Sequence, residues 1–236
     1  MGFDGEYGPL VMRLGGRLAF AAGLAAAPLP GAACGVELIL AMDVSRSVMN
    51  DEYDLQMQGL GAAFRDREVQ ELIRIAGGVA ATVTQWSGVD NQAQSIPWSL
   101  LTDAASSEAF ADRVAAQGRW FFGAFTAPGE ALTHARSISA RNPHDCARKV
   151  IDLSGDGYGN RGRAARDVSR ALAAEGFTIN ALAILGALNS PEDYYRENII
   201  AGPGAFVETA DGFEDYESAI RRKLIRELSP AFAMVE

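Results

Sequence analysis

The sequence has 236 residues, with 30 acidic against 21 basic side chains and a formal net charge of −9. This acidity disfavours binding to nucleic acids and to anionic membrane surfaces. Apolar residues make up 48% of the chain and charged residues 22%, a balance that excludes wholesale disorder and is ordinary for a globular protein. The length is sufficient for one large domain with a sizeable core.

Residues 1–33 have the pattern of a secretory signal peptide. Arg13 and Arg17 precede a short apolar stretch at 18–27, and small residues follow it. The stretch is shorter than the roughly 20 residues that a membrane-spanning helix needs, so we expect no transmembrane segment in the mature chain. A buried N-terminal helix is the alternative, but the stretch has no polar face. We therefore predict an exported protein, either periplasmic or extracellular.

The first strong strand signal is the apolar run Val36–Met42, which is typical of a strand buried on both faces of a parallel sheet. Three oxygen-bearing side chains follow at alternate positions, namely Asp43, Ser45 and Ser47. A polar loop just past the carboxyl end of such a strand is where open α/β sheets bind ligands. Hard oxygen ligands suit Mg²⁺, Mn²⁺ or Ca²⁺ and are poor for softer metals.

The remaining chain alternates between helical and strand patterns. Strands are predicted at 77–86, 94–98, 150–153, 177–185 and 205–208. Helices are predicted at 51–66, 103–117, from Pro128 onward, and at 163–175, 191–200 and 213–228. This alternation indicates βαβ units and a mostly parallel sheet with helices on both faces. Pro97 favours an edge position for its strand. We expect one domain at 35–229, followed by a C-terminal tail at 230–236.

Two later loops also carry oxygen side chains, Thr126 in GAFTAPG and Asp156 in SGDGYGN. With these three loops the chain resembles a von Willebrand factor type A (vWA) domain. DVSRS, which begins at Asp43, matches the D-x-S-x-S element of that family's metal-ion-dependent adhesion site. Thr126 matches the loop threonine and Asp156 the aspartate after the fourth strand, although Ala124-Phe125 replaces the usual small polar or glycine residues. The resemblance covers about 35–229.

The sequence around these motifs is similar to that of a family of exported bacterial vWA-like proteins with no assigned function. The resemblance implies a doubly wound α/β fold with a six-stranded sheet of order 3-2-1-4-5-6 and an antiparallel third strand. It also implies a divalent cation, Mg²⁺ or else Mn²⁺ or Ca²⁺, at Asp43, Ser45, Ser47, Thr126 and Asp156. A protein ligand would present an Asp or Glu carboxylate to that cation.

The charges of these residues indicate how they would share the cation. Ser45, Ser47 and Thr126 should touch it directly, and Asp43 and Asp156 should act through coordinated waters or serine hydroxyls. Direct binding by both carboxylates would quench the Lewis acidity that an outside carboxylate needs. The alternative is structural, with the serines capping a turn and Asp156 capping the next helix.

The two cysteines, Cys34 and Cys146, each precede an apolar run. If those runs are adjacent parallel strands, as the vWA strand order implies, both cysteines lie at the same end of the sheet. A pair so placed in an exported protein can form a disulfide. Two unrelated thiols, or a lipid-modified Cys34, are the alternatives.

The alternative function is enzymatic, that of a Mg²⁺-dependent hydrolase of the haloacid dehalogenase phosphatase type. Such enzymes carry D-x-D-x-[TV] and GDGxxD motifs and an aspartyl nucleophile. Here Ser45 replaces the second aspartate, the general acid, and Asn160 replaces the last. These replacements argue against phosphoryl transfer, so we expect a protein that is not an enzyme.

The roles of two further features remain open between alternatives. The aromatic run Trp120-Phe121-Phe122 precedes the Thr126 loop, and it belongs either to the core or to an exposed rim for a partner. Asn160 could orient a water at the site or stabilise its own turn, and we favour the turn.

Overall fold

The computed structural model describes residues 1–2, 34–123, 125–186 and 190–229. In these residues helices and strands alternate from Cys34 to Leu228. The strands are β1 (Cys34–Asp43), β2 (Val79–Trp86), β3 (Gln92–Leu101), β4 (Cys146–Gly155), β5 (Phe177–Ile184) and β6 (Val207–Ala210). The helices are α1 (Asn50–Arg65), α2 (Arg67–Ile75), α3 (Ala104–Ala115), α4 (Pro128–Ser139), α5 (Ala165–Ala174), α6 (Glu192–Asn198) and α7 (Tyr216–Leu228).

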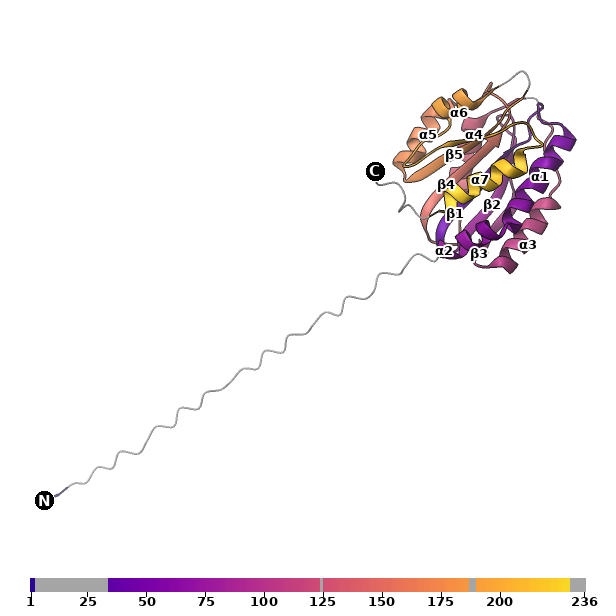
Figure 1. Ribbon diagram of the computed structural model, residues 1–236. Coiled ribbons are helices and arrows are strands. Elements are labelled where there is room, and N and C mark those ends of the chain that lie inside the picture. The colour runs from indigo at the N-terminus through magenta and orange to yellow at the C-terminus, as the bar shows by residue number, and fades with distance from the viewer. Residues whose placement is uncertain (3–33, 124, 187–189, 230–236) are drawn as a thin grey trace. The chain divides into compact units, whose positions relative to one another are not determined.

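The strands form one six-stranded sheet in the order β3-β2-β1-β4-β5-β6. β3 pairs antiparallel with β2, and every other pair is parallel. This arrangement confirms the predicted doubly wound α/β fold and its strand order (Figure 1). β1 lies between β2 and β4, so the loops that leave its carboxyl end sit where the strand order reverses, which is the usual ligand position of such sheets.

Side chains of β1 alternate between two apolar layers. Leu38, Leu40 and Met42 pack into a layer with α1, α3 and α7. Ile39 and Ala41 pack into a layer with α4 and α5 on the opposite face. Both faces of the strand are therefore buried, as its continuous apolar run predicts.

Two details of the sequence prediction were wrong. β3 is longer than the predicted strand at 94–98, because the chain pairs on both sides of Pro97 and the register shifts there between Ala81 and Val83. Such a bulge accommodates a proline without losing the strand. α2 was not predicted, although Asp66 caps it by accepting hydrogen bonds from the backbone N–H groups of Glu68 and Val69.

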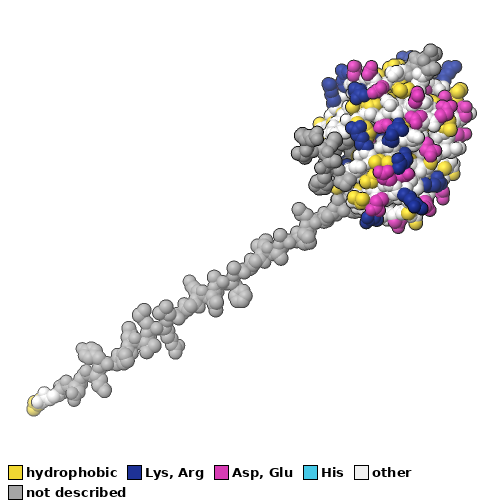
Figure 2. Space-filling view, in the orientation of Figure 1, with side chains coloured by type: hydrophobic (Ala, Val, Ile, Leu, Met, Phe, Trp, Pro, Cys, Tyr) yellow, Lys and Arg dark blue, Asp and Glu magenta, His cyan; other side chains and the backbone are white. Residues whose placement is uncertain are grey.

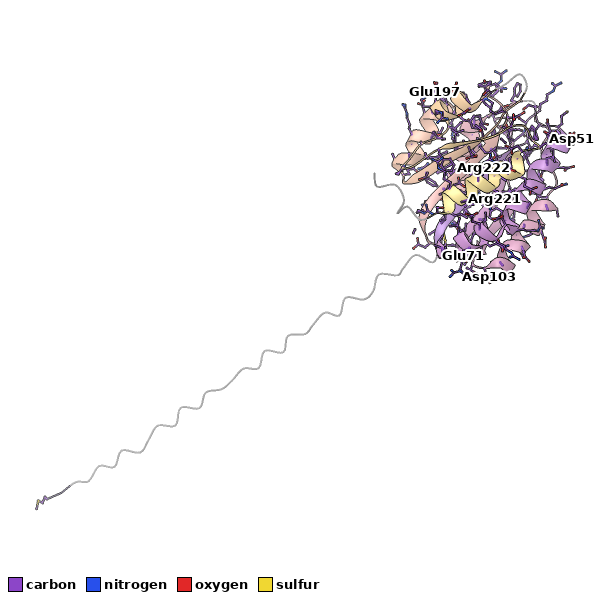
Figure 3. All side chains as sticks on the ribbon, in the orientation of Figure 1. Asp51, Glu71, Asp103, Glu197, Arg221 and Arg222 are labelled. Atoms are coloured by element: carbon purple, nitrogen blue, oxygen red, sulfur yellow. A yellow bond between two sulfur atoms is a disulfide. The ribbon has the colours of Figure 1, made fainter. Side chains whose placement is uncertain are left out.

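The amino end of the sheet carries the predicted disulfide. Cys34 and Cys146 are register partners on β1 and β4, with Cα atoms 4.5 Å apart, and their sulfurs are bonded. The disulfide is therefore confirmed. A sulfur in this bond cannot also carry a lipid. Figure 3 shows Glu71 and Asp103 toward this end of the molecule and Asp51, at the start of α1, toward the carboxyl end.

A buried ionic cluster fastens α7 to β4. Lys223 Nζ lies 2.7 Å from Asp152 Oδ1 and 2.5 Å from Glu227 Oε1, and none of these three side chains is more than 4% exposed. Asn180 donates a 2.8 Å hydrogen bond to the same Glu227 oxygen. Burial raises the pKa of Asp152 to about 7, because the single ammonium of Lys223 compensates that burial only in part.

The outer surface near α7 has mixed charge. Figure 2 shows acidic and basic side chains interspersed on this face rather than gathered by sign. Arg221 of α7, for example, pairs with Asp66 and Glu68 at the start of α2. None of the helices in the described ranges has the length and apolarity that a membrane crossing requires. The predicted signal peptide, apart from residues 1–2, and the predicted tail at 230–236 lie outside the described residues.

Removal of the disulfide should destabilise the domain. The bond closes a loop with a sequence separation of 112 residues, for which the chain-entropy model gives about 4–5 kcal/mol. The double variant Cys34→Ser/Cys146→Ser should lose most of this in urea-unfolding experiments. Titration of the denatured, unreduced protein should find no free thiol at these positions. Two reactive thiols per chain would contradict the bond.

Replacement of Lys223 by Met should cost about 3–5 kcal/mol of unfolding free energy at pH 8, because it leaves two buried carboxylates without a cation. The loss should shrink at pH 5.5, where Asp152 takes up a proton. Arg222→Met on the same helix is the matched control. Its side chain is 48% exposed, so we expect a loss below about 1 kcal/mol. Equal losses for the two variants would refute this account of the cluster.

Candidate metal centre

Four of the five predicted ligands form a continuous polar chain at the carboxyl end of the sheet. Asp43 ends β1 and accepts a 2.7 Å hydrogen bond from the backbone N–H of Ser45. The hydroxyls of Ser45 and Ser47 lie 3.2 Å apart. Ser47 donates a 2.8 Å hydrogen bond to Oδ1 of Asp156, which follows β4. Parallel pairing of β1 with β4 makes this approach possible across more than a hundred residues of sequence.

The chain runs from the interior to the surface. Asp43 is fully buried and Ser47 is exposed. Oδ2 of Asp43 is also buried and has no hydrogen-bond partner. A buried carboxylate oxygen without a donor is costly and unusual, which makes it a candidate for an ion or a water.

Glycine at position 155 allows this arrangement. A methyl group on Gly155 would lie 2.8 Å from Asp43 Oδ2 and 2.5 Å from the hydroxyl of the buried Tyr195. Any larger residue at the end of β4 would therefore collide with the carboxylate. The space beside Asp43 depends on the absence of this side chain.

Electrostatics disfavour an ionised Asp43 in the absence of a cation. Burial, and to a smaller extent the nearby carboxylate of Asp156, together raise the pKa of its carboxyl group to about 7. Burial also raises the pKa of Asp156. A divalent cation would reverse both effects, because an adjacent positive charge favours the ionised carboxylates.

Thr126 lies in the neighbouring loop and is held there by the β4–α5 loop. Asn160 accepts a 3.0 Å hydrogen bond from the Thr126 N–H through its side chain and donates a 2.9 Å hydrogen bond to the Thr126 carbonyl through its backbone. Asn160 therefore joins two loops, which neither sequence interpretation of this residue included. Ser45 also pairs with Gly123 in a parallel bridge, which brings this loop beside the first. In the described structure Thr126 makes no hydrogen bond to the other four predicted residues.

Arg119 is the residue that sequence reasoning missed. Its guanidinium donates hydrogen bonds of 2.8–2.9 Å to the carbonyls of Val44, Ser45, Val48 and Phe121. These bonds fix the backbone of the Asp43–Ser47 loop. A lone arginine beside three aromatic residues gives no sequence signal for this role, because the loop partners, the carbonyls of Val44, Ser45 and Val48, lie more than seventy residues away.

The donor set fits a hard cation. Two carboxylates and three hydroxyls lie at the same end of the sheet, and oxygen ligands of this kind suit Mg²⁺, Mn²⁺ or Ca²⁺. The described residues contain no group of three or more His, Cys, Asp or Glu side chains that could hold a metal. A site here would depend on the serine and threonine hydroxyls as much as on the acids.

Comparison with known proteins supports the vWA fold. The family model "Protein of unknown function (DUF1194)" matches residues 33–232. None of the curated proteins matches the sequence. Proximal thread matrix protein 1 from the mussel byssus is 20% identical, with a TM-score of 0.62 over 84% of this chain and 49% of its own. A second structure of that mussel protein has a zinc-occupied adhesion-site motif (18% identity, TM-score 0.59, 83% and 46% covered).

Two bacterial vWA domains are also similar. The domain from Catenulispora acidiphila is 20% identical, with a TM-score of 0.57 over 83% of this chain and 43% of that one. The domain of the type V pilus tip protein Mfa5 from Porphyromonas gingivalis is 11% identical, with a TM-score of 0.55 over 86% and 99%. At these identities the likeness concerns the fold. The chain spans about half the length of the mussel protein that it matches.

The fold is that of vWA domains rather than of the phosphatases considered above. Ser45 occupies the place of the phosphatase general acid, and its backbone N–H is bonded to Asp43. Asn160 occupies the place of the last phosphatase aspartate, and it is bonded to the backbone of Thr126.

The stability of the metal-free protein should depend on Asp43. Its pKa in the folded state, about 7, is above the ordinary value of 3.8, so the folded state binds more protons between these pH values. The stabilisation that results is complete below about pH 4 and is lost as pH rises through about 7. Between pH 5.5 and pH 8 we expect Asp43 to account for a loss of about 2 kcal/mol.

Chemical unfolding in chelator at both pH values, on wild type and Asp43→Asn, measures this loss. The variant should show a smaller decrease in unfolding free energy than wild type, since Asn does not titrate. Groups away from Asp43, such as Asp152, contribute equally to both proteins and cancel, whereas the coupled Asp156 is part of the difference. An identical pH dependence in the two proteins would contradict the raised pKa.

Proposed function

This chain belongs to the family of proteins of unknown function DUF1194, and we propose that it binds a protein partner through a divalent cation. The observation that carries the proposal is the buried Oδ2 atom of Asp43, which has no hydrogen-bond donor. It lies at the inner end of a polar chain that opens to solvent at Ser47. A bound cation would compensate this oxygen.

The five residues would have two roles at the cation, direct coordination and charge balance. The hydroxyls of Ser45, Ser47 and Thr126 would coordinate the cation. Asp43 and Asp156 would balance its charge through waters or through the serine hydroxyls. The hydrogen bond from Ser47 to Asp156 supports these roles, because the carboxylate of Asp156 already orients the Ser47 hydroxyl.

Neutral hydroxyl ligands determine what the site would capture. A divalent cation held this way supplies an electrophilic position that an outside carboxylate can occupy. Arg119 is not the group that would bind the outside carboxylate, because its guanidinium already donates hydrogen bonds to the carbonyls of Val44, Ser45 and Val48. An Asp or Glu side chain of a protein partner is therefore the ligand that we assign.

The nature of the cation follows from its ligands. Oxygen donors favour Mg²⁺, with Mn²⁺ and Ca²⁺ as alternatives. The motif of the mussel protein is occupied by zinc in one structure, so Zn²⁺ belongs in any titration series.

Export of the protein is the setting that we propose for this binding. The disulfide between Cys34 and Cys146 persists in an oxidising compartment and is rare in the cytosol. The signal-like pattern of residues 1–33 supports the same conclusion. The periplasm and the extracellular space remain the two possible destinations.

Calorimetric titration with Mg²⁺ tests the site. Asp156→Ala should weaken Mg²⁺ binding by about 10–100-fold, because residues that orient metal ligands typically contribute this much to affinity. Asp112→Ala is the matched control. Its carboxylate is 74% exposed on α3, so its affinity for Mg²⁺ should equal that of wild type.

Capture of a partner from periplasmic extract, with Mg²⁺ or with chelator, tests the function itself. The partner should be retained only with the cation, and Asp156→Ala should not retain it. If Asp156→Ala binds Mg²⁺ as wild type does, and no cation affects capture, the proposed function is wrong.

A further inference from the structure

Exposed large apolar side chains gather around the candidate metal centre. Of the nine such side chains among the described residues, all except Met1 and Ile75 lie at the carboxyl end of the sheet. They are Met49, Leu55, Val89, Trp120, Phe122, Phe125 and Tyr158. Concentrated apolar exposure at one end of a soluble domain marks an interaction site rather than chance.

Five of them, Met49, Trp120, Phe122, Phe125 and Tyr158, follow or precede the site residues closely in sequence, and we call them the apolar crown. Met49 comes two residues after Ser47, and Tyr158 two residues after Asp156. Trp120, Phe122 and Phe125 lie on the segment that ends at Thr126. The crown therefore belongs to the same three loops as the candidate ligands.

The fold does not require this exposure. Phe121 is partly buried and packs against the core beneath α1 and α7. Its neighbours Trp120 and Phe122 are 53% and 76% exposed. Both sequence interpretations of this aromatic run therefore apply, one to Phe121 and the other to its neighbours. The two exposed rings contribute little to the core and are available to a partner.

Arginines hold two crown rings in place. The guanidinium of Arg119 lies 5.0 Å from the centre of the Phe122 ring, and that of Arg161 lies 4.7 Å from the Phe125 ring. Cation–π contacts of this kind restrain a ring on the surface. Rings that are ordered beforehand lose less entropy when a partner covers them.

Hydrogen bonds hold the backbone of Trp120 and the ring of Tyr158. The Trp120 N–H donates a 2.8 Å hydrogen bond to the side chain of the buried Gln85. The Tyr158 hydroxyl donates a 3.0 Å hydrogen bond to the carbonyl of Ser190. Aromatic side chains with restrained positions are the residue type that dominates binding energy at protein interfaces.

Arginines lie beside Phe122 and Phe125, whereas Asp51 and Glu52 lie on the other side of Met49. Arg46 and Arg119 line a hollow of about 330 Å³ together with Met49 and Phe122. Arg161 lies over Phe125. These arginines stand out on a chain whose net charge is −9. That overall charge repels an anionic membrane, so a membrane surface is the less suitable occupant.

We propose that the apolar crown determines partner specificity, and that the partner is a protein segment whose Asp or Glu is flanked by large apolar side chains. This inference rests on the proposed function. The carboxylate would reach the metal centre, and the flanking side chains would pack on Phe122, Phe125 and Trp120. Neighbouring arginines would stabilise the additional negative charge.

A displayed peptide library with a central Asp between randomised flanks tests the inference. Wild-type protein with Mg²⁺ should enrich peptides with Phe, Leu, Ile, Met or Trp beside the Asp. A second library with the central position also randomised should return Asp or Glu there. Selection of the acid tests the proposed function, and selection of the flanks tests the crown.

Two variants complete the test. Phe122→Ser/Phe125→Ser should lose the apolar preference and bind an enriched synthetic peptide at least about tenfold more weakly. Its calorimetric affinity for Mg²⁺ alone should be unchanged. Ile75→Ser is the matched control, because Ile75 is also exposed but ends α2, away from the crown. It should bind the peptide as wild type does.

Several results would overturn the inference. If the residues that flank the Asp are not enriched, or if the crown variant binds the enriched peptide as wild type does, the crown does not determine partner specificity. Binding to phosphatidylglycerol vesicles that only the crown variant loses would assign the surface to a membrane. Self-association that only the crown variant loses would assign it to a second copy. Acid selection without flank selection would overturn the crown alone.

Discussion

The structure at the carboxyl end of the sheet depends on one buried carboxylate. Asp43 lies at the end of the central strand, where β2 and β4 flank it and apolar layers cover both faces. One of its oxygens is satisfied by the Ser45 N–H and the other has no partner. A fold selected only for stability would hold an apolar residue here. In the function that we propose, a cation would compensate this oxygen.

Neighbouring elements preserve the space and the shape that this carboxylate needs. Gly155 leaves room beside its unpaired oxygen, and Arg119 fixes the loop that follows it through four backbone carbonyls. Asn160 joins the Thr126 loop to the loop after β4. Three loops distant in sequence are thus held as one unit. A preorganised site of this kind binds its ligands without first ordering them.

Stabilising interactions and the candidate site lie in different parts of the sheet. At the amino end the Cys34–Cys146 bond joins the two central strands covalently. Midway along β4, Asp152 joins the buried cluster that anchors α7 through Lys223. At the carboxyl end the loops are free to carry polar and apolar groups that the core does not use. Stability is concentrated away from the candidate site, which leaves exposed rings such as Phe122 compatible with a stable fold.

The sequence by itself predicted a mostly parallel α/β sheet, its resemblance to vWA domains implied the strand order, and together they proposed the members of the candidate site. Alternating strand and helix patterns with a fully apolar β1 leave few topologies open, because buried parallel strands need helices on both faces. The D-x-S-x-S spacing marked Asp43, Ser45 and Ser47, since local spacing is visible in sequence. Only the tertiary structure decided how Arg119, Asn160 and Gly155 support those residues, and that Trp120 and Phe122 face outward while Phe121 faces inward. Those roles arise from contacts between segments far apart in the chain, mostly through backbone atoms and empty space, and neither leaves a pattern in the residue types.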